Sequence, residues 1–123
     1  MLTGPSRWLD ILMMKIDIDE TGPFVLAKLS GDLDTESSET FNTSLQEYVG
    51  SPLLLDLSGV ELISSSGLGA IINLVVRART CGGHVILVSP SVFVQGVFEI
   101  TSLDKWFDIA TTLEDAAARL RHE

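Results

Sequence analysis

The stretch LDLSGVELISSSGLGAI, residues 55–71, decides the fold predicted for this chain. It begins inside an apolar run, residues 53–57, which is typical of a central strand covered on both faces. A polar loop follows, and Ser65 or Ser66 then begins a helix that runs to about Thr80, where a glycine pair stops it. A buried strand followed by an amphipathic helix indicates one repeating unit of a layered α/β domain.

Apolar residues repeat with recognisable periods through the rest of the chain. A period of two predicts half-buried strands, continuous apolar runs predict buried strands, and spacings of three and four predict helices. These patterns predict strands at 14–18, 24–30, 53–57, 85–88 and 106–110, a turn at 21–23, a break at 31–34 and a loop after residue 57. They predict helices from Asp34 or Thr35 to Tyr48, from Ser65 or Ser66 to Thr80, from Ser89-Pro90 onward, and from residue 112 to 121.

The same spacings predict which side chains of the helices face the core. They are Phe41, Leu45 and Tyr48 in the first helix, Leu68, Ile71, Ile72, Val75 and Val76 in the second, and Val92, Phe93, Val97 and Phe98 in the third. Four aromatic residues are expected to pack in the core: Phe93, Phe98, Trp106 and Phe107. Exposure of any of them in a patch would instead indicate an interface.

The predicted order of elements is β-β-α-β-α-β-α-β-α. Strands and helices that alternate after an initial hairpin indicate a single α/β domain, with a mixed, mostly parallel sheet and helices packed on it. We expect this domain to span residues 14–121, with residues 1–13 as an N-terminal extension. Residues 8–13 fit either a short strand or a helical turn, and Met13 or Met14 is an alternative natural start.

Charge and composition narrow the classes of function. The 123 residues include 8 Lys plus Arg and 17 Asp plus Glu, so the formal net charge is −9, and residues 1–61 carry −8 of it. An acidic chain is repelled by nucleic acid and by anionic membranes. The first 19 residues contain neither a signal-peptide core nor a membrane span, and the single cysteine, Cys81, allows no internal disulfide. These features predict a cytoplasmic protein without membrane insertion.

Sequence signatures of common enzymes are missing. There is no P-loop, no dinucleotide-binding fingerprint after a strand, and no nucleophile elbow, and Gly67-Leu68-Gly69 alone is too weak a signal. Cys81 and His84 fit a turn with a buried cysteine better than a metal site. We therefore expect neither a catalytic residue nor a cofactor nor a metal. A small enzyme or nucleotide-binding protein that uses a helix N-terminus as an anion site stays an alternative.

The three serines before the second helix, Ser64 to Ser66, permit two interpretations. In the simpler one, serines cap the helix, and Gly67 and Gly69 let it pack close to the sheet. In the other, a phosphate on Ser65 or Ser66 would accept hydrogen bonds from the free N–H groups of the first turn, where the helix dipole favours negative charge.

Three segments together resemble the STAS-domain anti-sigma factor antagonist family. Residues 29–34 resemble its second strand and Gly-acid-Leu-Asp turn, residues 54–60 its central strand, and residues 65–69 its phosphorylation loop. The resemblance covers roughly residues 15–120 and implies the same β-β-α-β-α-β-α-β-α fold.

The resemblance also implies a function and its residues. In that family a serine kinase that is also the anti-sigma factor phosphorylates one serine, and a phosphatase of the protein phosphatase 2C class reverses this. The unphosphorylated form binds the kinase and releases the kinase's captured partner. By resemblance the phosphoacceptor here is Ser65, with Ser64 and Ser66 as possible neighbours. The implied partner-binding face comprises Asp32, Asp34, Ser64, Ser66, Gly67, Leu68, Asn73 and Arg77.

Ser64 departs from the family pattern, which has an acidic residue at this position. The loss of a carboxylate could change recognition by the kinase or phosphatase, and it leaves three hydroxyls in a row. A STAS subunit of a transporter or lipid-transport complex, acting without phosphorylation, is therefore the alternative function. We also expect Asp32 and Asp34 to lie near the Ser65 loop.

Overall fold

The computed structural model describes residues 14–121. The predicted extension at residues 1–13, including the segment 8–13 and Met13, lies outside the described residues, as does His122. Among the described residues, five strands form one sheet in the order β1-β2-β3-β4-β5. The pair β1–β2 is antiparallel and the other pairs are parallel, so the predicted mixed, mostly parallel sheet is confirmed.

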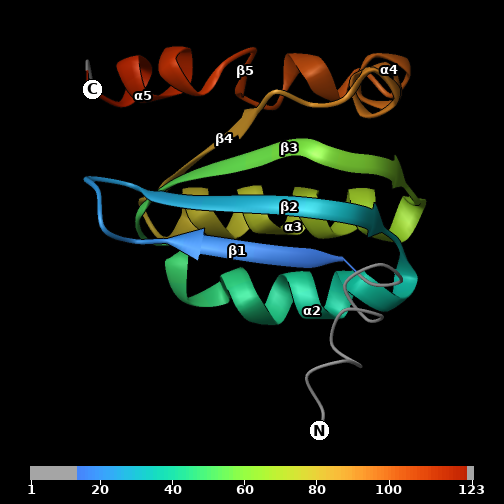
Figure 1. The fold of residues 1–123 in the computed structure, drawn as a ribbon, viewed down its shortest axis with the longest axis horizontal. Helices are drawn as coiled ribbons and strands as arrows, with labels where there is room; N and C mark the ends of the chain where they lie inside the picture. Colours follow the sequence, from blue (N-terminus) through green and yellow to red (C-terminus); the bar gives the residue numbers. More distant parts are fainter. Residues whose placement is uncertain (1–13, 122–123) are drawn as a thin grey trace, which may run out of the picture.

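The elements follow one another in the predicted order (Figure 1). The strands are β1 (Lys15–Asp19), β2 (Val25–Leu33), β3 (Pro52–Ile63), β4 (His84–Val88) and β5 (Ile109–Ala110). The α-helices are α2 (Thr35–Leu45), α3 (Ser65–Thr80), α4 (Val92–Ile100) and α5 (Leu113–Arg121), and the short 3₁₀ helices are η1 (Gln46–Tyr48) and η2 (Leu103–Lys105).

The core forms on both faces of β3. Leu53, Leu55 and Leu57 pack in a cluster with buried side chains of α2 and α3, including Phe41 and Ile71. Leu54 lies in a second cluster with side chains of β4, β5 and α5. Successive residues of a strand point to opposite faces, so the continuous apolar run is explained by helices on both sides of β3. In Figure 1, α3 lies behind β2 and β3, and α4 and α5 lie on the opposite side from α2.

Two strands are longer than the sequence predicts. β2 continues through the predicted break at residues 31–34 to Leu33, and β3 continues through the predicted loop to Ile63. The extensions pair with each other in parallel register, Gly31 with Val60 and Leu33 with Ile63, across two irregularities in the ladder. Such pairing between distant segments is invisible to local periodicity. It brings the ends of β2 and β3 side by side, where α2 and α3 begin.

The start of α4 also differs from the prediction. Ser91, rather than the Ser89-Pro90 pair, caps this helix, because the Ser91 hydroxyl accepts a bond from the Val94 N–H at 3.4 Å and donates to the Val60 carbonyl at 2.7 Å. Ser89 has a left-handed backbone with φ of 51° and belongs to the turn before the helix.

The last strand is shorter than the predicted 106–110. Residues 103–105 form η2, and the Arg79 guanidinium lies 4.3 Å from the centre of the Trp106 ring, so Trp106 packs against α3 instead of joining the sheet.

Most predicted core residues are buried or half-buried, and three are wrong. Val76, Val92 and Phe93 are exposed, and Cys81, predicted to be buried, is exposed as well. In α3 the stripe that faces the sheet is Ile71, Leu74, Val75 and Ala78, and in α4 it is Val94 and Phe98. Spacings of three and four define these stripes, and a one-residue error in phase exposes a side chain.

No helix among residues 14–121 is both long enough and apolar enough to cross a membrane.

Candidate functional site

The candidate site lies at the carboxyl ends of β2 and β3. α2 begins two residues after β2 ends, and α3 begins two residues after β3 ends, so two helix N-termini lie next to each other at this edge. The Ser64 N–H donates to the Leu33 carbonyl at 2.9 Å and holds the two segments together. The carboxyl edge of a parallel sheet is where α/β domains commonly place their sites.

The Ser64 side chain has a structural role as the N-cap of α3. Its hydroxyl caps α3 by accepting a bond from the Gly67 N–H at 3.2 Å, and its side chain is half-buried. Asp and Ser are about equally good at this cap position. A serine in place of the family's acidic residue therefore keeps the cap and removes only the charge.

The Ser66 hydroxyl also makes a hydrogen bond, whereas the Ser65 hydroxyl makes none within the described residues. The Ser66 hydroxyl is hydrogen-bonded to the Thr35 hydroxyl of α2 at 3.1 Å. The Ser65 side chain is exposed and makes no hydrogen bond to any residue of the described part of the chain. Of the three serines, Ser65 thus presents the available hydroxyl, at the first position of α3 where backbone N–H groups lack helical partners.

Asp34 caps α2 in the same way that Ser64 caps α3. Its carboxylate accepts a bond from the Ser37 N–H at 3.1 Å, and the Ser37 hydroxyl is 2.9 Å from the Asp34 N–H, which completes a capping box. The backbone N–H and then the hydroxyl of Ser37 hold the pKa of Asp34 below its usual value. Asp32 is exposed at the end of β2, and its carbonyl accepts a bond from the Ser37 hydroxyl at 2.8 Å.

A depression of about 300 Å³ lies between the ends of β2 and β3. It is lined by Asp32, Leu33, Asp34, Leu62, Ile63 and Ser64. The expectation that Asp32 and Asp34 lie near the Ser65 loop is therefore confirmed. Its lining combines apolar side chains with the carboxylates of Asp32 and Asp34, so the depression suits an aliphatic or basic group better than an anion.

The two glycines of the serine motif have different surroundings. A Cβ on Gly67 would lie 2.2 Å from the Leu33 carbonyl oxygen, so α3 can approach β2 only with glycine there. A Cβ on Gly69 would meet nothing within 4 Å. Gly67 is buried and therefore supports the site from beneath, while Gly69 lies on the surface.

The outer face of α3 continues the site along the helix. Ser66, Gly69, Asn73, Val76 and Arg77 are exposed at helical spacing. Leu68 is half-buried and packs against the core. Of the predicted partner-binding residues, Asn73 and Arg77 thus lie on the face that begins at the serines.

A neighbouring apolar surface was missed by the sequence analysis. Val92, Phe93 and Ile100 of α4 are 92%, 49% and 87% exposed, and Leu62 of β3 is 52% exposed. The sequence pattern predicts Val92 and Phe93 as core residues and marks Leu62 and Ile100 only as apolar. Whether the three residues of α4 face the core depends on the phase of this short helix, and that phase is set by contacts distant in sequence.

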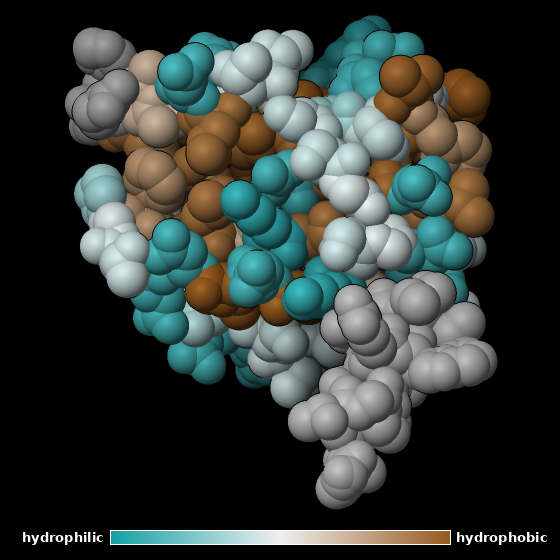
Figure 2. Space-filling view, viewed as in Figure 1, coloured by the Kyte–Doolittle hydropathy of each residue, from teal (hydrophilic) through white to brown (hydrophobic). Residues whose placement is uncertain are grey.

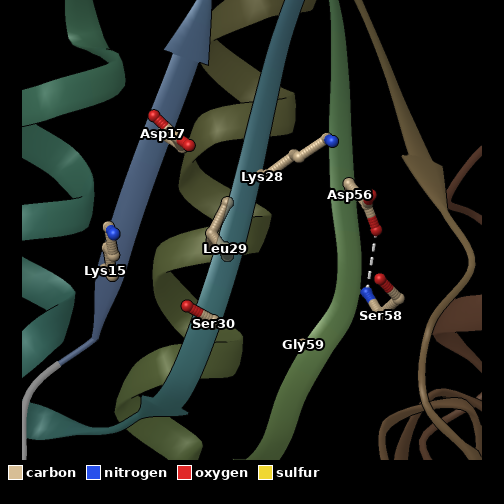
Figure 3. Close-up of a pocket in the computed structure, with 8 residues that line it drawn as sticks. All are labelled: Lys15, Asp17, Lys28, Leu29, Ser30, Asp56, Ser58 and Gly59. Carbon is tan, nitrogen blue, oxygen red and sulfur yellow. Dashed lines mark hydrogen bonds between the residues drawn. The ribbon is translucent and has the colours of Figure 1, made fainter. Parts of the chain in front are cut away.

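Away from the serines, the front face of β1, β2 and β3 carries polar side chains over a shallow depression of about 340 Å³ (Figure 3). Asp17, Lys28 and Asp56 stand opposite one another in the register of the three strands. Asp56 accepts a bond from the Ser58 N–H at 2.9 Å. Because the charges alternate across the strands, they balance one another without a ligand.

Four charged or titratable groups lie where β4 and β5 begin. His84 is 2.7 Å from Asp108, which also bonds Arg119 of α5, and Arg119 bonds Asp115 at 2.9 Å. Residues 14–121 hold no group of three or more His, Cys, Asp and Glu that could hold a metal ion.

The fold is that of a small α/β domain with a mixed sheet, and comparison with known proteins identifies its family. The model of the STAS domain matches residues 15–116. The chain therefore belongs to the STAS domain family. The matched residues include both acidic positions and all three serines of the candidate site.

Relatives of known sequence are named as anti-sigma factor antagonists. One from Thermotoga neapolitana is 42% identical over 64 residues, which cover 52% of this chain and 57% of that protein. BtrV of Bordetella bronchiseptica is 28% identical over 111 residues, which cover 88% of this chain and 96% of BtrV.

Solved structures show the same fold. An anti-sigma factor antagonist of Thermotoga maritima superposes with a TM-score of 0.79 at 28% identity, over 86% of this chain and 94% of that one. SpoIIAA in its unphosphorylated form superposes with a TM-score of 0.72 at 23% identity, over 89% of this chain and 98% of its own. SpoIIAA of Bacillus has also been solved in a phosphorylated form.

Proposed function

We propose that this chain is an anti-sigma factor antagonist that works by binding rather than by catalysis. Unmodified at Ser65, it binds a serine kinase that is also an anti-sigma factor, and it is released when Ser65 is phosphorylated. The observation that carries this proposal is the state of the three hydroxyls: Ser64 caps α3, Ser66 is bonded to Thr35, and Ser65 alone is exposed and unbonded among the described residues. The names of the relatives supply the class of partner.

Electrostatics explains why a phosphate at Ser65 would act as a switch. It adds about −1.5 to −2 charges at pH 7. The N-terminus of α3 stabilises this charge, so the fold tolerates it. A partner that packs over Ser65 would have to desolvate the phosphate beside Asp32 and Asp34, and the cost of burying unpaired charge favours release. The acidic edge also makes partner binding weaker at high salt.

The serine at position 64 bears on which enzymes act here. Because Ser64 keeps the cap, the geometry of the loop does not need the family's carboxylate. We propose that the cognate kinase acts without that charge, and that a phosphatase of the protein phosphatase 2C class removes the phosphate. Since sigma factors act on RNA polymerase, we place this cycle in the cytoplasm.

Phosphate mapping tests the proposal. The chain is incubated with ATP and each serine kinase of the anti-sigma class from the same genome, and the modified residue is identified by tandem mass spectrometry. We expect one phosphate, on Ser65, that is lost in Ser65→Ala and retained in the matched controls Ser64→Ala and Ser66→Ala. Phosphate on another serine would contradict the assignment of Ser65 as the phosphorylated residue. If no phosphate is found and the chain co-purifies with permease subunits, the transporter alternative is favoured.

A further inference from the structure

The outer face of α4 is apolar although it faces water. Val92, Phe93 and Ile100 of α4 and Leu62 of β3 are exposed, and we call these four side chains together the α4 apolar face. Phe93 and Ile100 are seven residues apart and so lie on one side of α4, a helix about 13 Å long, while Val92 lies about a quarter turn away. Figure 2 shows hydrophobic surface over α4, at the upper right of the molecule. Single exposed apolar residues are ordinary, but several on one short helix mark an interaction surface.

The α4 apolar face begins at the same edge of the sheet as Ser65. The Ser91 hydroxyl donates to the Val60 carbonyl at 2.7 Å, which fixes the start of α4 beside the end of β3. Leu62 lies two residues beyond Val60 and lines the depression that contains Ser64. Leu62 therefore borders the serine edge, and the start of α4 is anchored two residues before it on the same strand.

Charges around this face indicate the kind of partner. Glu61 precedes Leu62 and is exposed, and Glu99 precedes Ile100, where it is held by Gln95 at 3.1 Å. α4 contains no Lys or Arg. A second copy packed on the same face would bring the Glu61 and Glu99 carboxylates of both copies together. A partner with an apolar centre and basic residues around it fits both the surface and its rim.

The size of the face indicates that it works together with another surface. Four side chains contribute on the order of a few hundred Å², whereas a stable complex buries roughly 800 Å² on each partner. We propose that the α4 apolar face is the second half of the interface with the anti-sigma factor, which covers α4 with apolar side chains flanked by Lys or Arg. This inference rests on the proposed function.

Substitution of the most exposed residues tests the inference. The double variant Val92→Ser/Ile100→Ser changes side chains that contribute little to the core, so its melting temperature should match that of the unaltered chain. We expect the Kd for the recombinant kinase that phosphorylates the chain to rise at least about tenfold. Leu113→Ser on α5, another exposed apolar residue, is the matched control and should leave the Kd unchanged.

Charge variants test the basic rim. Ile100→Lys should weaken binding more than Ile100→Glu, because the lysine would face cationic residues of the partner. An unchanged Kd in the double variant, with release by Ser65 phosphorylation intact, would overturn the inference and leave the proposed function standing. A chain that binds no anti-sigma factor would overturn both. A dimer seen by sedimentation that the double variant abolishes would assign the face to a second copy and overturn the inference.

Discussion

The polar side chains at the two ends of the sheet differ in how many of them are hydrogen-bonded or ion-paired within the fold. Where β2 and β3 end, uncharged Ser64 and the carboxylate of Asp34 cap helices, and Ser65 is left exposed. Where β4 and β5 begin, Asp108 is bonded to both His84 and Arg119. Groups that satisfy one another stabilise the fold, whereas a hydroxyl left to solvent is available to a partner. We therefore expect the first end to bind the partner and the second to contribute mainly to stability.

Gly67→Ala should disrupt the packing where β2 and β3 end, and it should have the largest effect on the free energy of unfolding. The added methyl group would lie 2.2 Å from the Leu33 carbonyl, so α3 must move away from β2. We expect the free energy of unfolding to fall by about 3 kcal/mol, measured by urea denaturation. Gly69→Ala is the matched control, since its methyl group meets open space. Because alanine favours a helix, that control should gain up to about 1 kcal/mol. Equal losses in both would contradict the packing assigned to Gly67.

Asp108→Ala should weaken the other end without affecting binding. It removes the Asp108 carboxylate from both His84 and Arg119, and Arg119 keeps its bond to Asp115. These groups are about one-third exposed, so solvent screening limits the expected loss of unfolding free energy to about 1 kcal/mol. The loss should shrink at high salt, and the Kd for the anti-sigma factor should not change. A weakened complex would show that this end also contacts the partner.

The pH dependence of stability should show the contribution of the Asp34 cap of α2, and this effect should be smaller than the two above. The pKa of Asp34 is lower in the folded chain than in the unfolded one, because the Ser37 N–H donates to the carboxylate. Its contribution is complete above the unfolded pKa, near 4, and is lost as the pH falls through the folded pKa.

Asp34→Asn, which keeps an oxygen for the Ser37 N–H, should therefore lose less stability than the unaltered chain when the pH is lowered below about 4. Chemical denaturation at several pH values measures this. The pKa of Asp19 is also lowered, chiefly by its hydrogen bond from the Thr21 hydroxyl, so part of the acid sensitivity should remain. Identical pH profiles would show that Asp34 makes no such contribution.

Local patterns in the sequence predicted the elements and their order well. The apolar run at residues 53–57 and the cap at Asp34 depend on neighbours in the chain, so they could be predicted. The start of α3 at Ser65 is another example. The closeness of Asp32 and Asp34 to the serines followed from the family resemblance.

Features that depend on distant contacts could not be predicted. β2 and β3 extend because Leu33 pairs with Ile63. The distinct states of the three serines depend on Thr35 of another helix, and the exposure of Phe93 depends on the phase of α4. The assignment of the serines and of Phe93 to an interface with the kinase stays a prediction.

The affinity of the chain for its anti-sigma factor, with and without phosphate on Ser65, tests the central claim most directly. Both forms are titrated with the kinase by calorimetry, and Ser65→Ala serves as a control that should bind within about twofold of the unmodified chain. We predict that the phosphate raises the Kd at least about tenfold. Equal Kd values for the two forms would contradict the account.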